Sequence, residues 1–109
     1  MFNSALLATQ GKEFIKSIFS NSTDIYLKAA DFQSNASIVI IELSDAYRPI
    51  IFLATELYAL FSNHTDKNIR YSTLDSGSVT SSTLNIIYTT LDGSPVIDIN
   101  KTGCCYFFG

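Results

Sequence analysis

The stretch SIVIIEL, residues 37–43, decides the fold that the sequence predicts. Its run of β-branched residues is typical of a strand that is buried on both faces, so we expect it at the centre of a sheet. Residues 25–32 form a second predicted strand just before it. The short link of residues 33–35 between the two favours an antiparallel hairpin.

A first helix is predicted before this hairpin, over residues 4–20. Its apolar residues recur at helical spacing and share one face, namely Leu7, Phe14, Ile15, Ile18 and Phe19. Gly11 is the weak point of the pattern, because glycine in a helix interior costs about 1 kcal/mol relative to alanine. It marks either a kink or the true start of the helix.

A second helix is predicted after the hairpin. Ser44 or Asp45 provides an N-cap, and Pro49 fits the first turn because it lacks a backbone donor. Residues 50–61 are apolar apart from a few positions, with Glu56 as the one charge. A membrane span needs about 20 apolar residues, so the run favours a buried core helix over an interfacial or membrane segment.

The C-terminal half is predicted to be a meander of four strands, over residues 69–74, 79–91, 96–99 and 104–108. Turn-forming residues separate them, as in the Asp92-Gly93-Ser94 hairpin signal. The expected order is therefore α-β-β-α-β-β-β-β in a single domain, residues 1–109. This is an α+β class, with two helices packed on a mainly antiparallel sheet. The aromatic tail at residues 106–108 either completes the core or meets a partner at an exposed edge.

The composition narrows the function. Ten acidic residues against seven Lys and Arg give a net charge of −3, and the scattered cations form no basic patch that would neutralise phosphates. We therefore expect neither a nucleic-acid ligand nor a membrane association. A disulfide between the adjacent Cys104 and Cys105 would be strained. Since residues 1–8 also lack the pattern of a signal peptide, we expect free thiols in the cytoplasm.

Catalytic chemistry has few of its usual parts in this sequence. His64 is the one histidine, which leaves a triad or a histidine-based zinc site without partners. No glycine-rich phosphate loop is present. The sequence predicts no catalytic residues, no metal and no cofactor, so we do not expect an enzyme.

Protein binding is the leading functional hypothesis. We expect a small acidic domain of the inhibitor or immunity type, which neutralises a basic partner such as a toxin by covering its active surface. One alternative is a small enzyme or ligand-binding domain with a pocket between sheet and helices, which would use Glu42, Glu56 and His64. The other is a homo-oligomer subunit. The residues predicted to contact the partner are Asp31, Asp66, Asp75, Asp92, Tyr47 and Tyr71.

Overall fold

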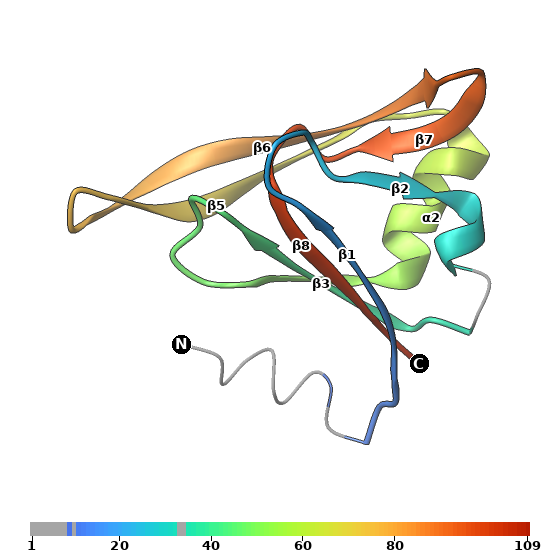
Figure 1. Cartoon of the computed structure of the whole chain (residues 1–109), viewed down its shortest axis with the longest axis horizontal. Helices are drawn as coiled ribbons and strands as arrows, with labels where there is room; N and C mark the ends of the chain where they lie inside the picture. The colour runs from blue at the N-terminus through green and yellow to red at the C-terminus, as the bar shows by residue number, and fades with distance from the viewer. Residues whose placement is uncertain (1–8, 10, 33–34) are drawn as a thin grey trace.

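Two antiparallel sheets dominate the computed structural model, which describes residues 9, 11–32 and 35–109 (Figure 1). The first, sheet A, has the strand order β1-β8-β3-β4, and the second, sheet B, has the order β2-β7-β6-β5. Sheet A comprises β1 (Phe14–Ser20), β8 (Gly103–Phe108), β3 (Ile38–Leu43) and β4 (Ile50–Leu53). Sheet B comprises β2 (Tyr26–Lys28), β7 (Ser94–Asp98), β6 (Ser78–Leu91) and β5 (Lys67–Asp75).

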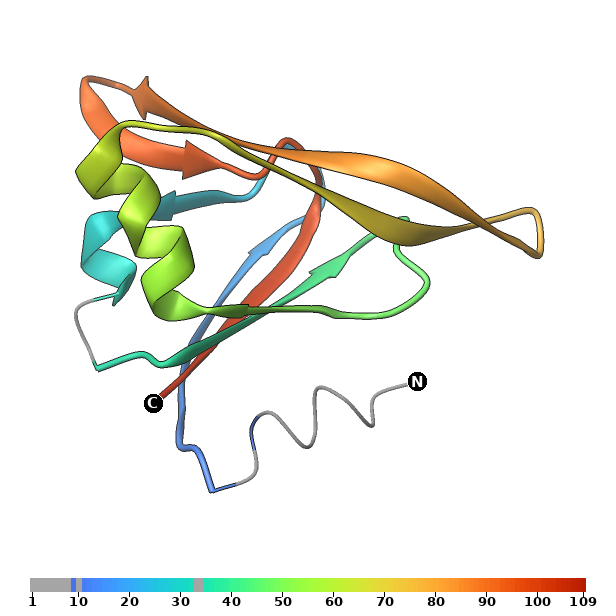
Figure 2. The same ribbon diagram turned by 180° about the vertical axis from the view of Figure 1, so that it is seen from behind.

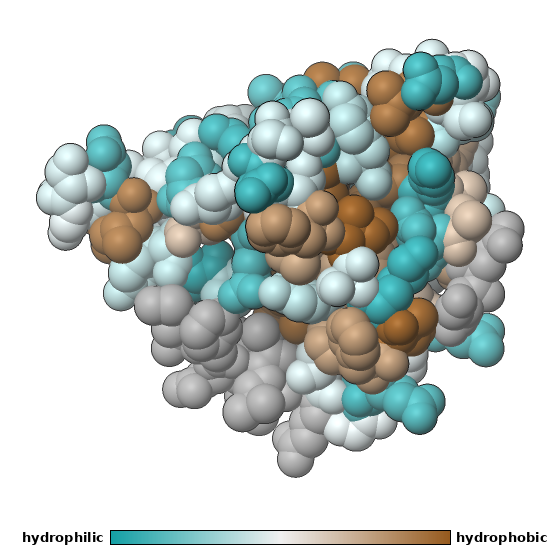
Figure 3. Space-filling view, viewed as in Figure 1, coloured by the Kyte–Doolittle hydropathy of each residue, from teal (hydrophilic) through white to brown (hydrophobic). Residues whose placement is uncertain are grey.

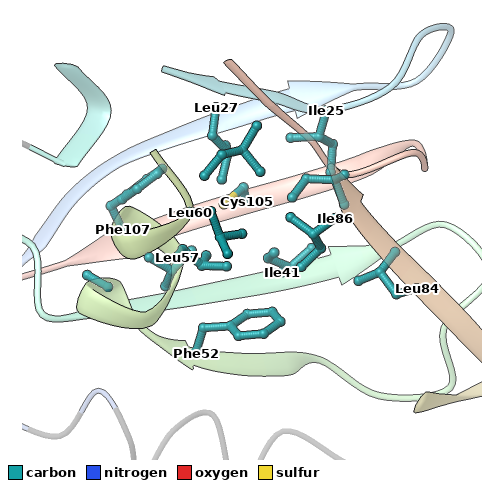
Figure 4. Close-up of a cluster of buried hydrophobic side chains, with 14 of the residues drawn as sticks. Ile25, Leu27, Ile41, Phe52, Leu57, Leu60, Leu84, Ile86, Cys105 and Phe107 are labelled. Atoms are coloured by element: carbon teal, nitrogen blue, oxygen red, sulfur yellow. The ribbon is translucent and has the colours of Figure 1, made fainter. Parts of the chain in front are cut away.

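A single core joins the sheets and the helix. The α-helix α2 (Ala54–Asn63) and the short 3-10 helix η1 (Ala29–Phe32) lie at one end of the molecule, and the β5–β6 hairpin projects from the other (Figures 1 and 2). Leu57 of α2 meets Ile41 and Phe107 of sheet A and Ile86 of sheet B in one buried cluster (Figure 4). Burying each such side chain contributes about 1.5–3 kcal/mol to stability.

The predicted fold class was wrong. Among the described residues the fold is mostly β, with one α-helix and a 3-10 turn rather than two helices on one sheet. The observed order of the described elements is β-β-(3-10)-β-β-α-β-β-β-β. No helix among these residues is both long enough and apolar enough to cross a membrane.

The predicted first helix is a strand from Phe14 onward, and residues 4–8 and 10 of it lie outside the described residues. Its apolar residues come in adjacent pairs, a helical spacing, but in the strand the two members of a pair point to opposite faces. Pairing with β8 decides between helix and strand, because it places Ile18 opposite the buried Cys105. Phe19 then points to the other face, where it is exposed.

The predicted second helix begins later than expected. Residues 50–53 form β4, paired with β3, and only Ala54 starts the helix. The Glu56 carboxylate accepts a hydrogen bond from the Leu53 N–H at 3.0 Å, and so caps the helix there. Asp45 and Pro49, expected in the first turn of this helix, lie instead in the loop between β3 and β4.

The predicted hairpin between residues 25–32 and 37–43 does not form. β2 pairs with β7, and β3 pairs with β8 and β4. The segment 29–32 is the 3-10 helix η1, so the chain leaves sheet B after Lys28 and enters sheet A at Ile38. β3 is nevertheless an interior strand, as its apolar run predicts.

The five strands predicted from residue 37 and from residue 69 onward are confirmed, but the last one leaves the meander. β5, β6 and β7 are neighbours in sheet B, whereas β8 lies between β1 and β3 in sheet A. Gly103 begins β8 at a φ of +148°, and a Cβ there would collide with the Glu42 carbonyl oxygen. Of the C-terminal aromatic tail, Phe107 is fully buried in the core, whereas Tyr106 and Phe108 are half-buried.

Candidate functional site

Two of the residues predicted to contact a partner are buried and bonded to other residues of the chain. Asp31 is 8% exposed; its carboxylate pairs with Lys16 Nζ at 2.6 Å and accepts the Lys28 N–H at 2.7 Å. Tyr71 is 7% exposed and donates its hydroxyl hydrogen to Asp45 at 2.9 Å. Burial, together with the Asp45 carboxylate, raises the pKa of Tyr71 above its usual range.

The other four predicted contact residues do not gather into one patch. Asp75 ends β5 at the tip of the projecting hairpin, and Asp92 lies at the turn between β6 and β7. The 14 residues of β6 separate them, a span of about 40 Å at the rise of a β-strand. Asp66 accepts the Tyr88 N–H at 3.0 Å, and Tyr47 packs under the Arg48 guanidinium. A basic partner for these side chains stays a prediction.

The groups predicted for an enzyme pocket are also dispersed. Glu56 lies in the first turn of α2 and His64 just after its last turn, about 12 Å apart at the rise of an α-helix. Glu42 points to the outer face of sheet A. There the neighbouring Cys104 thiol, burial and the Glu42 carboxylate together raise the pKa of the Tyr106 phenol. The structure does not bring the three groups to one concave surface.

A cavity of about 530 Å³ lies beside α2. Its volume is within the range of small-molecule sites. Its described lining is Phe32, Ala36, Ala54, Thr55, Tyr58, Ala59, Ser62 and Asn63. These side chains include no charged or imidazole group, so they offer shape and hydroxyl or amide hydrogen bonds but no general acid or base at neutral pH.

The β5–β6 hairpin is the most prominent surface feature. Its turn residues Ser76 and Gly77 have φ values of 49° and 82°, as a two-residue type I′ turn requires. The hairpin projects beyond the two sheets (Figures 1 and 2). Leu74 and Val79, cross-strand partners near its tip, are 50% and 54% exposed. Figure 3 shows hydrophobic atoms at this end of the molecule.

The register of the hairpin fixes which backbone groups face outward. A type I′ turn is flanked by a hydrogen-bonded pair, here Asp75 and Ser78, and such pairs then alternate with non-bonded ones. On β5 two of the outward groups near the tip have partners. The Leu74 N–H donates to the Asp45 carbonyl at 3.1 Å, and the Ser72 carbonyl accepts the Tyr47 N–H at 2.8 Å.

The same alternation leaves outward groups open on β6. It turns the backbone N–H and C=O of Val79, Ser81 and Thr83 away from β5. β7 pairs with β6 only at residues 87–91, and the Asn100 side chain reaches no further than the Asn85 carbonyl, at 2.9 Å. No described strand pairs with β6 at these three residues. We call this stretch, residues 79–83, the β6 edge.

The other sheet edges in the described ranges carry protection against strand addition. β1 has a bulge between Phe14 and Lys16, and a lysine. β2 and β4 are three and four residues long. The 45–47 loop covers β5 through the Ala46–Thr73 bridge. Bulges, lysines, short strands and covering loops all discourage another chain from pairing, and the β6 edge has none of them.

The sequence contains a signal for this edge. Residues 76–91 hold no charged residue and no proline, although edge strands usually carry one or the other. The pattern predicts a long strand but does not show which neighbouring strand is missing.

A comparison of the chain with models of known protein families, with curated proteins and with solved structures found no match.

Proposed function

We propose that this chain is a protein-binding domain that accepts an extended segment of a partner polypeptide as an added strand on the β6 edge. The observation that carries the proposal is the row of outward backbone groups at Val79, Ser81 and Thr83 on an uncharged strand. Strand addition uses such groups for affinity and the side chains on either face for specificity. The inhibitor or immunity role, which was predicted for acidic side chains elsewhere on the protein, stays a prediction.

The energetics suit a reversible interaction. Each backbone hydrogen bond contributes about 0.5–1.5 kcal/mol net, and ordering the partner segment offsets part of the gain. Leu74 and Val79 add apolar area beside the edge, where both are about half exposed. We also propose the cytoplasm as the compartment, and the free thiols of Cys104 and Cys105 support a reducing environment.

The test removes one outward donor without touching the fold. Peptides that bind the protein are selected from a displayed library of random peptides of about ten residues, long enough to cover the edge. We expect Ser81→Pro to weaken their binding at least about tenfold, since proline has no N–H and its ring obstructs the incoming strand. Ser81→Ala, which retains the backbone donor, is the matched control. Binding is measured by calorimetry, and folding by circular dichroism.

A second measurement locates the bound peptide. In NMR spectra of the complex, the amide protons of Val79, Ser81 and Thr83 should become protected from solvent exchange, while those of Thr80 and Ser82, which point to β5, should change little. Selected peptides that bind wild type and a folded Ser81→Pro variant equally, or that protect no β6 amide, would overturn the proposal.

A further inference from the structure

Arg70 places a cation directly over the β6 edge. It lies on β5, and its guanidinium crosses to β6, where Nη2 and Nε donate to Ser81 Oγ at 2.9 and 3.2 Å. Ser81 is one of the residues whose backbone groups face outward. The positive charge is therefore held beside the position that an added strand would take.

This guanidinium has no carboxylate partner among the described residues. Their ion pairs join Lys16 to Asp31, Lys67 to Glu56 and Lys101 to Asp45. Arg70 is exposed, and Ser81 Oγ uses only part of the fork of donors that a guanidinium offers. The remaining donors are open to an acidic group.

An added strand would bring a side chain within reach of these donors. Neighbouring strands lie about 4.8 Å apart, and directly opposite residues on one face have Cβ atoms about 4.5–5.5 Å apart. On the premise of strand addition at the β6 edge, we propose that the partner segment carries Asp or Glu opposite Ser81. Its carboxylate forms a charge-assisted pair with the Arg70 guanidinium.

The same face sets a second preference two residues away. Val79 lies beside Ser81 on this face and forms a non-bonded pair with Leu74, the kind in which side chains approach most closely. An apolar partner side chain opposite Val79 covers both. The partner motif on this face is thus an apolar residue and an acidic residue separated by one position.

The opposite face of the hairpin disfavours a second carboxylate. A groove beside the hairpin is lined by Asp45, Thr73, Leu74, Asp75, Thr80, Ser81 and Ser82. By the alternation of the strands, the side chains of Thr73, Asp75, Thr80 and Ser82 lie on this opposite face. Asp45 is already paired with Lys101 at 3.3 Å. Asp75 forms no ion pair among the described residues, so another acid on this face would meet its like charge in place of Arg70. The two faces together fix which side of an added strand turns toward Arg70.

The test uses two synthetic peptides that differ in one group. Each alternates threonine and isoleucine over about seven residues, with glutamate at the centre of one and glutamine at the centre of the other. We expect wild type to bind the glutamate peptide about fivefold more tightly, the scale of an exposed ion pair. Arg70→Gln should bind both equally, and Arg70→Glu should prefer a third peptide with a central lysine. Arg48→Gln, an equal charge change away from the edge, should keep the fivefold difference.

The outcomes separate this inference from the function on which it rests. Equal affinity of wild type for the glutamate and glutamine peptides overturns the acidic preference and leaves strand addition in place. Absence of binding by both peptides at millimolar concentration, or binding that a folded Ser81→Pro variant retains, overturns strand addition and the preference with it.

Discussion

At the scale of single residues, Asp98 is a carboxyl group whose charged form is disfavoured in the folded protein. Burial raises its pKa, and so do the hydrogen bond and the repulsion from the neighbouring Asp24 carboxylate, although the Asn100 N–H partly opposes them. A carboxyl group whose folded-state pKa is raised binds protons more tightly when folded. The protonated carboxyl group therefore favours the folded state, and this stabilisation is lost as the pH rises through that pKa.

We predict that Asp98→Asn stabilises the protein at pH 7 by about 0.5 kcal/mol, the scale of a partly exposed charge pair. The amide oxygen still accepts the Asn100 N–H, so that bond is retained. Urea unfolding at pH 7 and at pH 3 measures the effect, which should vanish at the lower pH because Asp98 is then protonated. Asp24→Asn should give a similar gain and the double variant little more. A gain that is the same at both pH values would contradict the assigned cause.

At the scale of elements, the start of β8 depends on one glycine. Gly103 has a φ of +148°, and a Cβ there would collide with the Glu42 carbonyl oxygen of β3, a backbone atom that cannot rotate away. We predict that Gly103→Ala lowers the free energy of unfolding by at least about 3 kcal/mol, through backbone strain and displacement of the β3–β8 pair.

Gly93→Ala is the matched control for this prediction. Gly93 also has a positive φ, of +81°, but a Cβ there meets nothing within 4 Å. Its cost should be limited to the left-handed backbone, about 1–2 kcal/mol. Urea unfolding of both variants measures the difference. Equal losses at the two glycines would show that the contact with β3 plays no part.

Elements with one dominant pattern could be read from the sequence, and elements whose residues fit two patterns could not. The β-branched run of residues 38–41 and the Thr-rich residues 79–91 specify strands by local preference. Residues 50–53 continue without a polar break into α2, so only pairing with β3 separates strand from helix. The strands that pair with β2 and β8 could not be predicted from the sequence either, because pairing across 60 or more residues depends on the whole core.

For the candidate site, too, the sequence showed residue type and local pattern but not the neighbours in space. Asp31 and Tyr71 were predicted as contacts from residue type, yet their neighbours in space bury them. The uncharged stretch around the β6 edge was visible in the sequence, but its openness follows from where β7 stops and where the 45–47 loop lies. Openness is a property of the assembled sheet rather than of the strand.

At the scale of the whole molecule, an open β6 edge raises the question of why two copies would not pair through it. An antiparallel pair of β6 edges centred on Ser81 would bring two Arg70 guanidiniums together over the same face, because each already reaches Ser81 Oγ. The net charge of −3 adds repulsion between the copies. The Arg70 charge that we propose attracts an acidic strand therefore also opposes pairing between two copies.

We predict that Arg70→Thr strengthens self-association through the β6 edge, lowering the dimer dissociation constant about fivefold, the scale of one exposed charge interaction. Sedimentation equilibrium over a range of concentrations measures it. Arg48→Thr makes the same charge change on a residue that packs over Tyr47, and should leave the constant near that of wild type. Wild type in about 1 M salt, where the screening length is about 3 Å, should approach the Arg70→Thr value. If Arg70→Thr and Arg48→Thr sediment alike, repulsion between Arg70 side chains does not keep the β6 edges apart.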